Sequence, residues 1–397
     1  MMSRDRPAIL LGGGSIAVSV ARSLGRAGIR VYALGSAPPD TVAHSRYCNV
    51  FVNIRHGEGV QERWLSWLDS GPMGGVFLPC HDEALDLVAH HRASLVDRGY
   101  FVYEANDEVV LAMLDKQETY SRARRAGVAT PSTFVVRDQH DVEPALHEIG
   151  FPCALKPLHA HRFVRHFGFR QKAFIVRDRA QFDDALANLL KLGLEVMVTE
   201  IIPGGDDQLF SFITYVDDNG NPLFRFVKRK LRQFPPGFGM GCYHVEEWNP
   251  IVAELGWSFF EAIGLRGFAY VEFKRDARDN AFKLIECNHR FGTGIELLTA
   301  AGIDAPLITY RRALGQPVSA LRSYRRGVRL WHPLDDTRTF LMYRRKRELS
   351  IAAWIRSLMH PLRVPIFRWY DPKPTLVSHW LLLKTLRKRL SARTVRR

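Results

Sequence analysis

The sequence contains little cysteine, and its five thiols are widely spaced: Cys48, Cys80, Cys153, Cys242 and Cys287. No pair has the spacing of zinc ligands or of a redox motif. The chain also lacks an uninterrupted apolar run near the ~18 residues that a transmembrane helix needs. Its apolar start is interrupted at Gly12–Gly14, which argues against a signal peptide. We therefore expect a cytoplasmic protein in a reducing compartment.

Acidic residues are scarce at the C-terminal end. Residues 321–397 contain 20 Lys and Arg but 4 Asp and Glu, a net charge of +16. The rest of the chain contains 36 Lys and Arg and 37 Asp and Glu, a net charge of −1. The near-neutral body argues against a general nucleic-acid-binding protein. The length of 397 residues predicts two or three domains.

The basic C-terminal segment also has apolar residues at helical spacing and three tryptophans, Trp354, Trp369 and Trp380. This composition is typical of a peripheral helix at an anionic membrane surface, here the inner face of the membrane. A helical appendage that packs on the body with a solvated basic face fits equally well, and nucleic acid fits less well. Membrane binding would favour a lipid-linked or polymeric acceptor.

A β-α-β pattern opens the chain, with strands at Ala8–Leu11 and Val31–Leu34 and a glycine turn before the helix between them. Backbone N–H groups at such a turn can receive an anion. The acid that would hold an adenine ribose is missing after the second strand, at Gly35 and Ser36. The pattern therefore favours a structural or substrate-side turn over a dinucleotide site.

A second strand-helix unit places His81, Asp82 and Glu83 at the carboxyl end of a strand. Ligands often bind at that edge of an open parallel sheet. The alternative is that Asp82 caps the following helix and Glu83 complements its dipole.

A β-hairpin is expected between Tyr270–Lys274 and Phe282–Glu286, because both segments contain strand formers and Asp276–Asn280 has turn chemistry. It would place Glu272 and Glu286 on facing strands. Taken alone, the pair also fits an ordinary charged surface hairpin.

Asn288 follows Glu286 by two residues on the same face, and Arg290 lies two residues further. Carboxylate and amide oxygens suit Mg²⁺, and a fixed guanidinium suits the charge of a phosphorylated intermediate.

These groups end an ordered series. It begins with Lys116 before a helix and Lys156 at the end of an apolar strand, and continues with Glu200 before a Pro-Gly-Gly break. Lys228, Lys230 and Arg232 then precede a glycine-rich loop. In this order the chain resembles the ATP-grasp superfamily of carboxylate–amine ligases, and within it the branch that includes D-aspartate ligases. The resemblance covers about residues 8–320 and is strongest over residues 248–294 and 301–317.

The resemblance implies an α/β and α+β fold. A Rossmann-like pre-ATP-grasp domain would span residues 1–112 and a two-lobed ATP-grasp domain residues 113–320. The small lobe would cover about residues 113–198 and the large lobe about residues 199–320. A basic, amphipathic helical extension would follow at residues 321–397.

The resemblance also implies site residues. The nucleotide would be bound by Lys156 at the α/β-phosphates, Lys116 in support, Glu200, Ile201 and Ile202 at the adenine, and Asp207 or Asp206 at the ribose. Mg²⁺, with Mn²⁺ as an alternative, would be bound by Glu272, Glu286 and Asn288. Arg290 would hold the acyl phosphate, with Lys230 or Arg232 at the γ-phosphate or the carboxylate.

The implied reaction joins a small-molecule carboxylate to an amine through an acyl phosphate and releases ADP and phosphate. Phosphorylation is needed because oxide is a poor leaving group. The alternatives are another ATP-grasp reaction, of the carboxylase or kinase type, and a non-catalytic, membrane-associated ATP-binding module. A nucleic-acid partner is not expected, and the resemblance leaves a homodimer open.

The chain departs from the family pattern at two places. The usual Asn-Pro-Arg is Asn288-His289-Arg290 here, so His289 stands in place of the proline. It would be either a proton shuttle or a solvent-facing substitution. The loop at residues 158–172 is basic and aromatic rather than glycine-rich, which suggests an anionic or large acceptor. The residues concerned are His159, His161, Arg162, Arg165 and Lys172.

Overall fold

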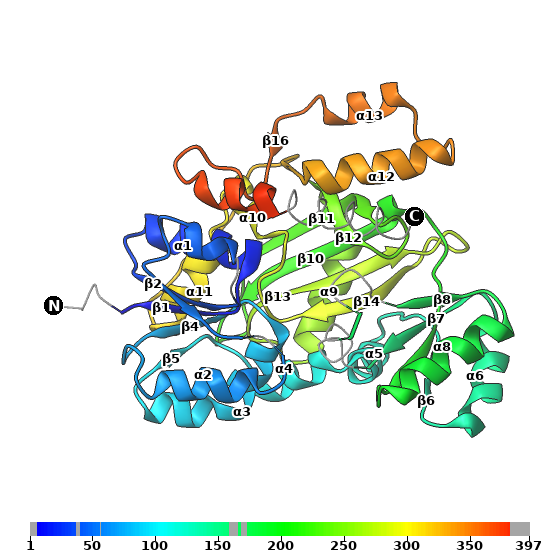
Figure 1. The fold of residues 1–397 in the computed structure, drawn as a ribbon, viewed down its shortest axis with the longest axis horizontal. Helices are drawn as coiled ribbons and strands as arrows, with labels where there is room; N and C mark the ends of the chain where they lie inside the picture. Colours follow the sequence, from blue (N-terminus) through cyan, green and yellow to red (C-terminus); the bar gives the residue numbers. More distant parts are fainter. Residues whose placement is uncertain (1–5, 37–39, 56, 159–165, 168–172, 382–397) are drawn as a thin grey trace, which may run out of the picture. The chain divides into compact units, whose positions relative to one another are not determined.

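The computed structural model describes residues 6–36, 40–55, 57–158, 166–167 and 173–381. The chain forms two compact units, each discontinuous in sequence (Figure 1). Unit 1 contains Met1–Glu104, Arg290–Ser319 and Val364–Arg397, and unit 2 contains Ala105–His289 and Ala320–Arg363. The predicted boundary at residue 320 lies one residue from the limit between Ser319 and Ala320, whereas those at residues 112 and 198 do not coincide with a unit limit; the predicted domains remain a prediction.

Unit 1 contains a parallel sheet in the order β3-β2-β1-β4-β5, which confirms the predicted α/β opening. Its strands are β1 (Ala8–Leu11), β2 (Val31–Gly35), β3 (Val50–Asn53), β4 (Val76–Pro79) and β5 (Phe101–Val102). Its helices are α1 (Gly14–Arg26), α2 (Val60–Leu68), α3 (Asp82–Asp97), α10 (Ile295–Ala301) and α11 (Ala305–Ala313), with a short 3₁₀ turn η1 (Thr41–His44). Strands β1 and β4 are buried along their whole length, as expected for central strands of a parallel sheet.

The glycine turn before α1 is filled by a side chain of the chain itself. Asp40 accepts hydrogen bonds from the backbone N–H of Gly14 at 2.8 Å and of Val42 at 3.2 Å. A Cβ on Gly13 would lie 1.6 Å from an oxygen of Asp40. The carboxylate occupies the position that an anion would take, which supports the structural interpretation of this turn.

The last segment of unit 1 is held to the first by one buried carboxylate. Asp371 is 1% exposed and accepts from Arg22 Nε at 2.8 Å, Ser45 Oγ at 2.7 Å and the backbone N–H of Arg46 at 2.9 Å. Arg22 itself is 3% exposed. A buried guanidinium is stable only when paired, so this contact fixes residues near 371 against α1.

Unit 2 begins with α4 (Asp107–Leu114) and α5 (Lys116–Arg125) and contains two antiparallel sheets. The smaller sheet has the order β6-β9-β7-β8. Its strands are β6 (Thr133–Val136), β7 (Cys153–Pro157), β8 (Phe174–Val176) and β9 (Val196–Glu200). Helices α6 (Val142–Ile149) and α8 (Arg179–Lys191) pack on it, with η2 (Gln139–Asp141) before α6.

The larger sheet has the order β14-β13-β10-β11-β12-β15-β16. Its strands are β10 (Leu209–Val216), β11 (Pro222–Phe234), β12 (Met240–Glu246), β13 (Gly267–Arg275), β14 (Phe282–Asn288), β15 (Arg329–Trp331) and β16 (Leu362–Arg363), with η3 (Asp206–Gln208) before β10. Helix α9 (Pro250–Ala262) starts at Asn249, whose side chain accepts from Val252 N at 3.1 Å. Its apolar side packs on Phe212, Val227 and Val271, so one face of the sheet is core and the other is free to carry polar groups.

The predicted C-terminal extension is only partly helical. Helices α12 (Pro333–Arg345) and α13 (Ile351–Leu358) were expected, but Arg329–Trp331 pairs with β12 and Leu362–Arg363 pairs with Arg329–Leu330. The helical extension was expected, but these strands were not predicted because strands this short carry no alternating pattern to detect. Residues 320–363 are therefore part of unit 2.

Candidate active site

The acidic pair on the β13–β14 hairpin is the centre of the candidate site. Glu272 and Glu286 are directly opposite each other, as predicted, and the chain turns at Asp276–Asn280 with Asn280 in the left-handed region. Like charges that face each other across strands destabilise a sheet. The arrangement is therefore one that gains from a cation between the two carboxylates.

Two lysines share the polar face with this pair. Glu272 is opposite Ser211, and Ser211 is opposite Lys228, so these three side chains lie in one row across the sheet. Lys230, two residues along β11, places Nζ 3.7 Å from Glu272 Oε2. Both lysines are nearly buried, at 5% and 8% exposed. The sheet thus holds carboxylates and amines side by side, the arrangement needed for a metal and an anion.

The residues present fit a nucleotide-bound magnesium rather than a metal held by protein alone. Asn288 is 8% exposed and follows Glu286 by two residues. Within the described ranges no group of three or more His, Cys, Asp and Glu side chains could hold an ion. Mg²⁺ in phosphate sites is bound by one or two carboxylates, with phosphate and water oxygens completing the octahedron. Glu272, Glu286 and Asn288 match that requirement.

The side chain of Glu200 has protein partners. It accepts from Ser132 N at 3.0 Å and pairs with Arg278 and with Lys283, whose Nζ is 3.4 Å away. Burial would raise the pKa of this carboxyl, but the Ser132 hydrogen bond and the two cations outweigh it and lower the pKa below its usual value. The end of β9 is therefore fixed, which leaves the backbone at Ile201 and Ile202 as the part of the predicted adenine site that could meet a base.

The structure separates the two acids that the sequence left as alternatives at the ribose. Asp206 is 8% exposed and accepts from Gln233 Nε2 at 2.7 Å, Gly237 N at 2.9 Å and Tyr343 Oη at 2.5 Å. Its contacts hold the start of the glycine-rich loop. The Asp207 side chain is 47% exposed and pairs with Arg229 at 3.0 Å. Asp207 is thus the more accessible of the two.

Arg232 lies in a different environment from Lys230. Its guanidinium donates to both oxygens of Asp336, at 2.6 Å and 3.0 Å, and to Ser357 Oγ at 3.0 Å. The Asp336 side chain is fully buried and Arg232 is 7% exposed. These contacts tie β11 to α12 and α13, so Arg232 has a structural partner, whereas Lys230 faces Glu272.

Arg290 belongs to unit 1, where it pairs with Asp82 at the start of α3. The sequence had suggested that Asp82 caps this helix, but His81 is the capping position and makes no side-chain capping bond. His289 belongs to unit 2 and is 2% exposed, with Nε2 2.5 Å from the carbonyl oxygen of Arg266. The expectation that His289 faces solvent was therefore wrong.

The remaining predicted nucleotide residues lie on the first part of unit 2. Lys156 is half-buried on β7, opposite Met197 of β9, and Lys116 is the first residue of α5. Asp115 caps that helix through Gln117 N and Glu118 N. The loop residues His159, His161, Arg162, Arg165 and Lys172 lie outside the described residues.

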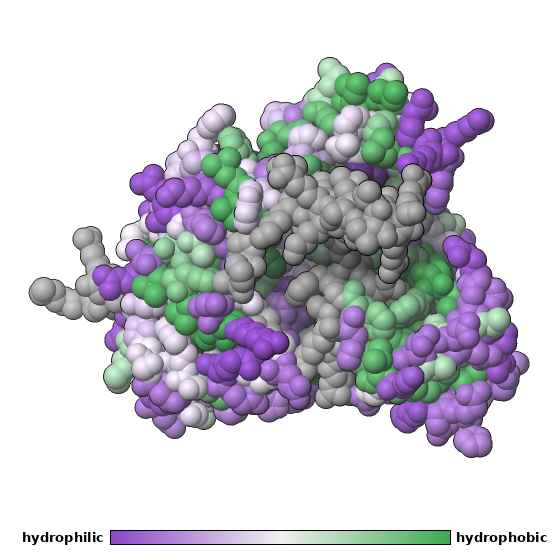
Figure 2. All heavy atoms as spheres, viewed as in Figure 1, coloured by the Kyte–Doolittle hydropathy of each residue, from purple (hydrophilic) through white to green (hydrophobic). Residues whose placement is uncertain are grey.

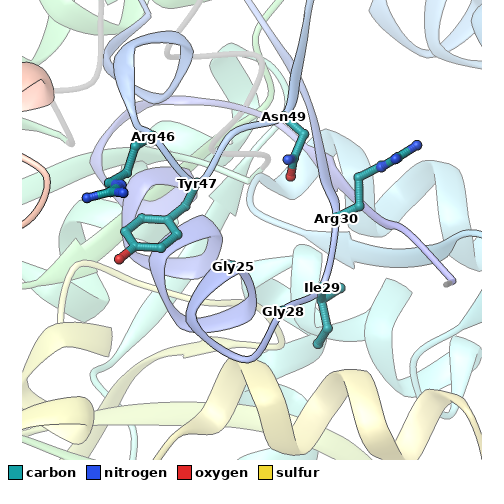
Figure 3. Close-up of a pocket in the computed structure, with 7 residues that line it drawn as sticks. All are labelled: Gly25, Gly28, Ile29, Arg30, Arg46, Tyr47 and Asn49. Atoms are coloured by element: carbon teal, nitrogen blue, oxygen red, sulfur yellow. The ribbon is translucent and has the colours of Figure 1, made fainter. Parts of the chain in front are cut away.

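A cavity of about 440 Å³ lies elsewhere, in unit 1 at the end of α1 (Figure 3). It is lined by Gly25, Gly28, Ile29, Arg30, Arg46, Tyr47 and Asn49. Figure 3 shows Arg46 and Tyr47 over the helix, with the Arg30 side chain extending away from them. A Cβ on Gly25 would lie 2.6 Å from the Tyr47 ring, so this glycine permits the packing. The lining contains none of the predicted site residues.

Two imidazoles near the lysines, the buried His244 and the partly exposed His332, were missed by the sequence interpretation. The rings of His244 on β12 and His332 before α12 are 6.3 Å apart. Burial, then Lys228, His332 and Lys230, lower the pKa of His244 well below its usual value. Burial lowers the pKa of His332 to about 4, against 6.5 in an unperturbed side chain. Both rings are thus neutral in the folded protein at neutral pH.

We expect the protein to become less stable as the pH is lowered, because these rings are held neutral in the folded state. In the unfolded chain His332 binds a proton near pH 6.5, but in the folded chain only near pH 4, so the unfolded state binds more protons in between. The contribution of this ring to the free energy of unfolding is fully present above pH 6.5. It is lost as the pH falls through this window, by roughly 1–3 kcal/mol for one ring. Urea denaturation across the window measures it, and His332→Gln should flatten the slope. An unchanged slope in His332→Gln would contradict the assignment.

Comparison with known proteins shows what the chain is similar to in sequence and in fold. No family model matches the chain. It is 27% identical to a D-aspartate ligase of Enterococcus faecium over 322 residues, covering 78% of this chain and 75% of that protein. A biotin carboxylase–ATP complex from Campylobacter jejuni superposes with a TM-score of 0.66 at 15% identity, over 82% of this chain and 74% of that one. An L-amino acid ligase from Bacillus licheniformis gives a TM-score of 0.61 at 17% identity, over 80% and 76%.

The solved structures share the fold, with a parallel N-terminal sheet followed by antiparallel sheets. The similarity to the D-aspartate ligase extends over 78% of this chain. The chain therefore has the ATP-grasp fold, and its sequence is similar to that of a D-aspartate ligase over most of its length.

Proposed function

We propose that the protein is an ATP-dependent ligase that joins a small carboxylic acid to an amine. The observation that carries the proposal is the facing pair Glu272 and Glu286 with Lys230 3.7 Å from Glu272. An ATP-dependent acid activation needs a metal and a fixed cation close together. The likeness to a protein named D-aspartate ligase supports a carboxylate–amine reaction and makes D-aspartate the first acid to test.

Each group has a distinct task in this proposal. Mg²⁺, held by Glu272, Glu286 and Asn288, would supply charge neutralisation at the phosphate oxygens. Lys156 binds the α/β-phosphates of ATP and Lys116 supports the nucleotide site, while Ile201 and Ile202 meet the adenine and Asp207 meets the ribose. Lys230 positions the transferred γ-phosphoryl group or the acid.

The reaction has two steps. A carboxylate oxygen of the acid attacks the γ-phosphorus, the bond to the β-phosphate oxygen breaks, and ADP leaves. The amine then attacks the acyl carbon, phosphate leaves with the C–O electrons, and the amine loses a proton to solvent. Arg290 stabilises the oxyanion of the tetrahedral intermediate. Asp82, which pairs with Arg290, fixes the orientation of that guanidinium.

The test is ADP release by the purified full chain with Mg-ATP, an acid and an amine, combined with mass analysis of products. We expect ADP release beyond a single turnover only when both substrates are present, with one amide formed per ADP. Accumulation of a phosphorylated substrate over many turnovers without an amine would show the kinase-type reaction, and a carboxylated product that requires bicarbonate would show the carboxylase type. Absence of Mg-ATP binding at millimolar concentration, measured by calorimetry, would remove the proposal.

A further inference from the structure

Helix α13 is attached to unit 2 along one side. The ring of Trp354 stacks on Phe340 of α12 with centroids 4.5 Å apart, and its Nε1 donates to Asp336 at 2.9 Å. Ser357 accepts from Arg232 at 3.0 Å. Because these residues lie one turn apart, they form one side of the helix and hold it in a defined orientation.

The outward side of α13 is apolar and exposed. Ile351, Ile355 and Met359 recur every four residues and are 51%, 50% and 74% exposed. This spacing places Ile351 and Ile355 in one stripe along the helix, and Met359 follows directly at its C-terminal end. No residue of α13 is buried, so nothing in the described part of unit 2 covers the stripe. Figure 2 shows hydrophobic residues gathered over α13, with hydrophilic ones beside them.

A run of cations precedes the stripe. Arg344, Arg345, Lys346 and Arg347 are consecutive and exposed at the end of α12, and Arg356 is exposed on α13 itself. Glu348 is the single acid between residues 344 and 359. We call Arg344–Arg347 together with Ile351, Ile355 and Met359 the α13 surface. Its charge and its apolar stripe are both complementary to an anionic lipid bilayer, whose headgroups attract cations while its interface takes up apolar side chains.

We propose that the α13 surface docks unit 2 onto an anionic membrane. The phosphates of a nucleic acid would pair with the cations, but the apolar stripe would remain exposed to water. A second copy of the chain would bring the two sets of cations together in a two-fold contact. Within the described residues no helix is long and apolar enough to cross a bilayer, so the contact is one of binding at the surface.

The experiment is cosedimentation of the full chain with vesicles of phosphatidylcholine alone and with about one third phosphatidylglycerol. We expect binding to the anionic vesicles at least about tenfold tighter than to neutral ones, and weaker as salt shortens the screening length. The triple variant Ile351→Gln, Ile355→Gln, Met359→Gln should bind the anionic vesicles at least about tenfold more weakly. Arg344→Gln, Arg345→Gln, Lys346→Gln should lose the preference for anionic lipid.

The matched control replaces three exposed apolar residues outside the α13 surface, Met73, Val96 and Leu192, with glutamine; they are 81%, 52% and 41% exposed. It should bind vesicles as the unmodified chain does. The unfolding midpoint of each variant is to be measured by chemical denaturation, to verify that the variant is folded. The proposal is overturned if the Ile351, Ile355, Met359 variant binds vesicles normally, if a duplex oligonucleotide competes all protein off the vesicles, or if sedimentation shows a dimer that this variant abolishes.

Discussion

Replacing Glu286 with glutamine is expected to lower ATP-dependent ADP release about a thousandfold. The substitution keeps the shape of the side chain and removes one of the two charges that face each other on the hairpin. If the pair binds a nucleotide-bound magnesium, half of the protein's charge on that metal is lost, and higher Mg²⁺ should restore little activity. The measurement is ADP release at saturating substrates over a range of Mg²⁺ concentrations.

The same variant should remain folded, which separates a site effect from a folding effect. Without a metal, removing one of two opposing carboxylates relieves repulsion, so the free energy of unfolding should stay equal or rise by about 0.2–1 kcal/mol. Glu254→Gln is the control, because Glu254 is exposed on α9, which packs on the opposite face of the sheet. Full activity of Glu286→Gln would contradict the predicted role of the acidic pair in binding the metal.

Replacing Asp336 with alanine is expected to cost about 3–5 kcal/mol of stability. The fully buried carboxylate accepts two bonds from Arg232 and one each from the indole N–H groups of Trp331 and Trp354, at 3.0 Å and 2.9 Å. Its loss would leave a buried guanidinium and two partly buried indole donors without this partner. Chemical denaturation monitored by tryptophan fluorescence measures the change.

The neighbouring acid provides the control. Asp335 is 36% exposed and pairs with Arg338 one turn away at 3.2 Å, so Asp335→Ala should cost under about 1 kcal/mol. The double variant Arg232→Met, Asp336→Leu should recover much of the loss, because apolar residues often replace a buried ion pair at little cost. If this folded double variant catalyses normally, Arg232 is structural; if it is inactive, the predicted role of Arg232 at the phosphate or carboxylate gains support.

Local pattern was sufficient to predict the hairpin. Alternation along β13, strand formers in β14 and turn residues at Asp276–Asn280 placed Glu272 opposite Glu286, and the register agrees. The same alternation along β11 places Lys228 and Lys230 on one face. Short-range periodicity determines these features, so one sequence reveals them.

Partners far apart in sequence could not be predicted in this way. Lys230 and Arg232 look equivalent on the strand, but β11 has a register shift between them and Arg232 meets a carboxylate 104 residues later. Asp206 and Asp207 are adjacent acids, and the choice between them depends on Gln233, Gly237 and Tyr343. Which acid is buried is decided by tertiary contacts that no local signal contains.

The buried contact between Arg22 and Asp371 has a consequence for synthesis of the protein on the ribosome. The first segment of unit 1 is complete at Glu104, but the carboxylate for Arg22 emerges roughly 270 residues later. At about 5–20 residues per second this delay is on the order of 13–50 s. During that time Arg22 must remain solvated, so α1 cannot reach its final burial. A nascent chain would therefore expose part of its first domain until translation is nearly finished, and a chain released before Asp371 would retain that exposed surface.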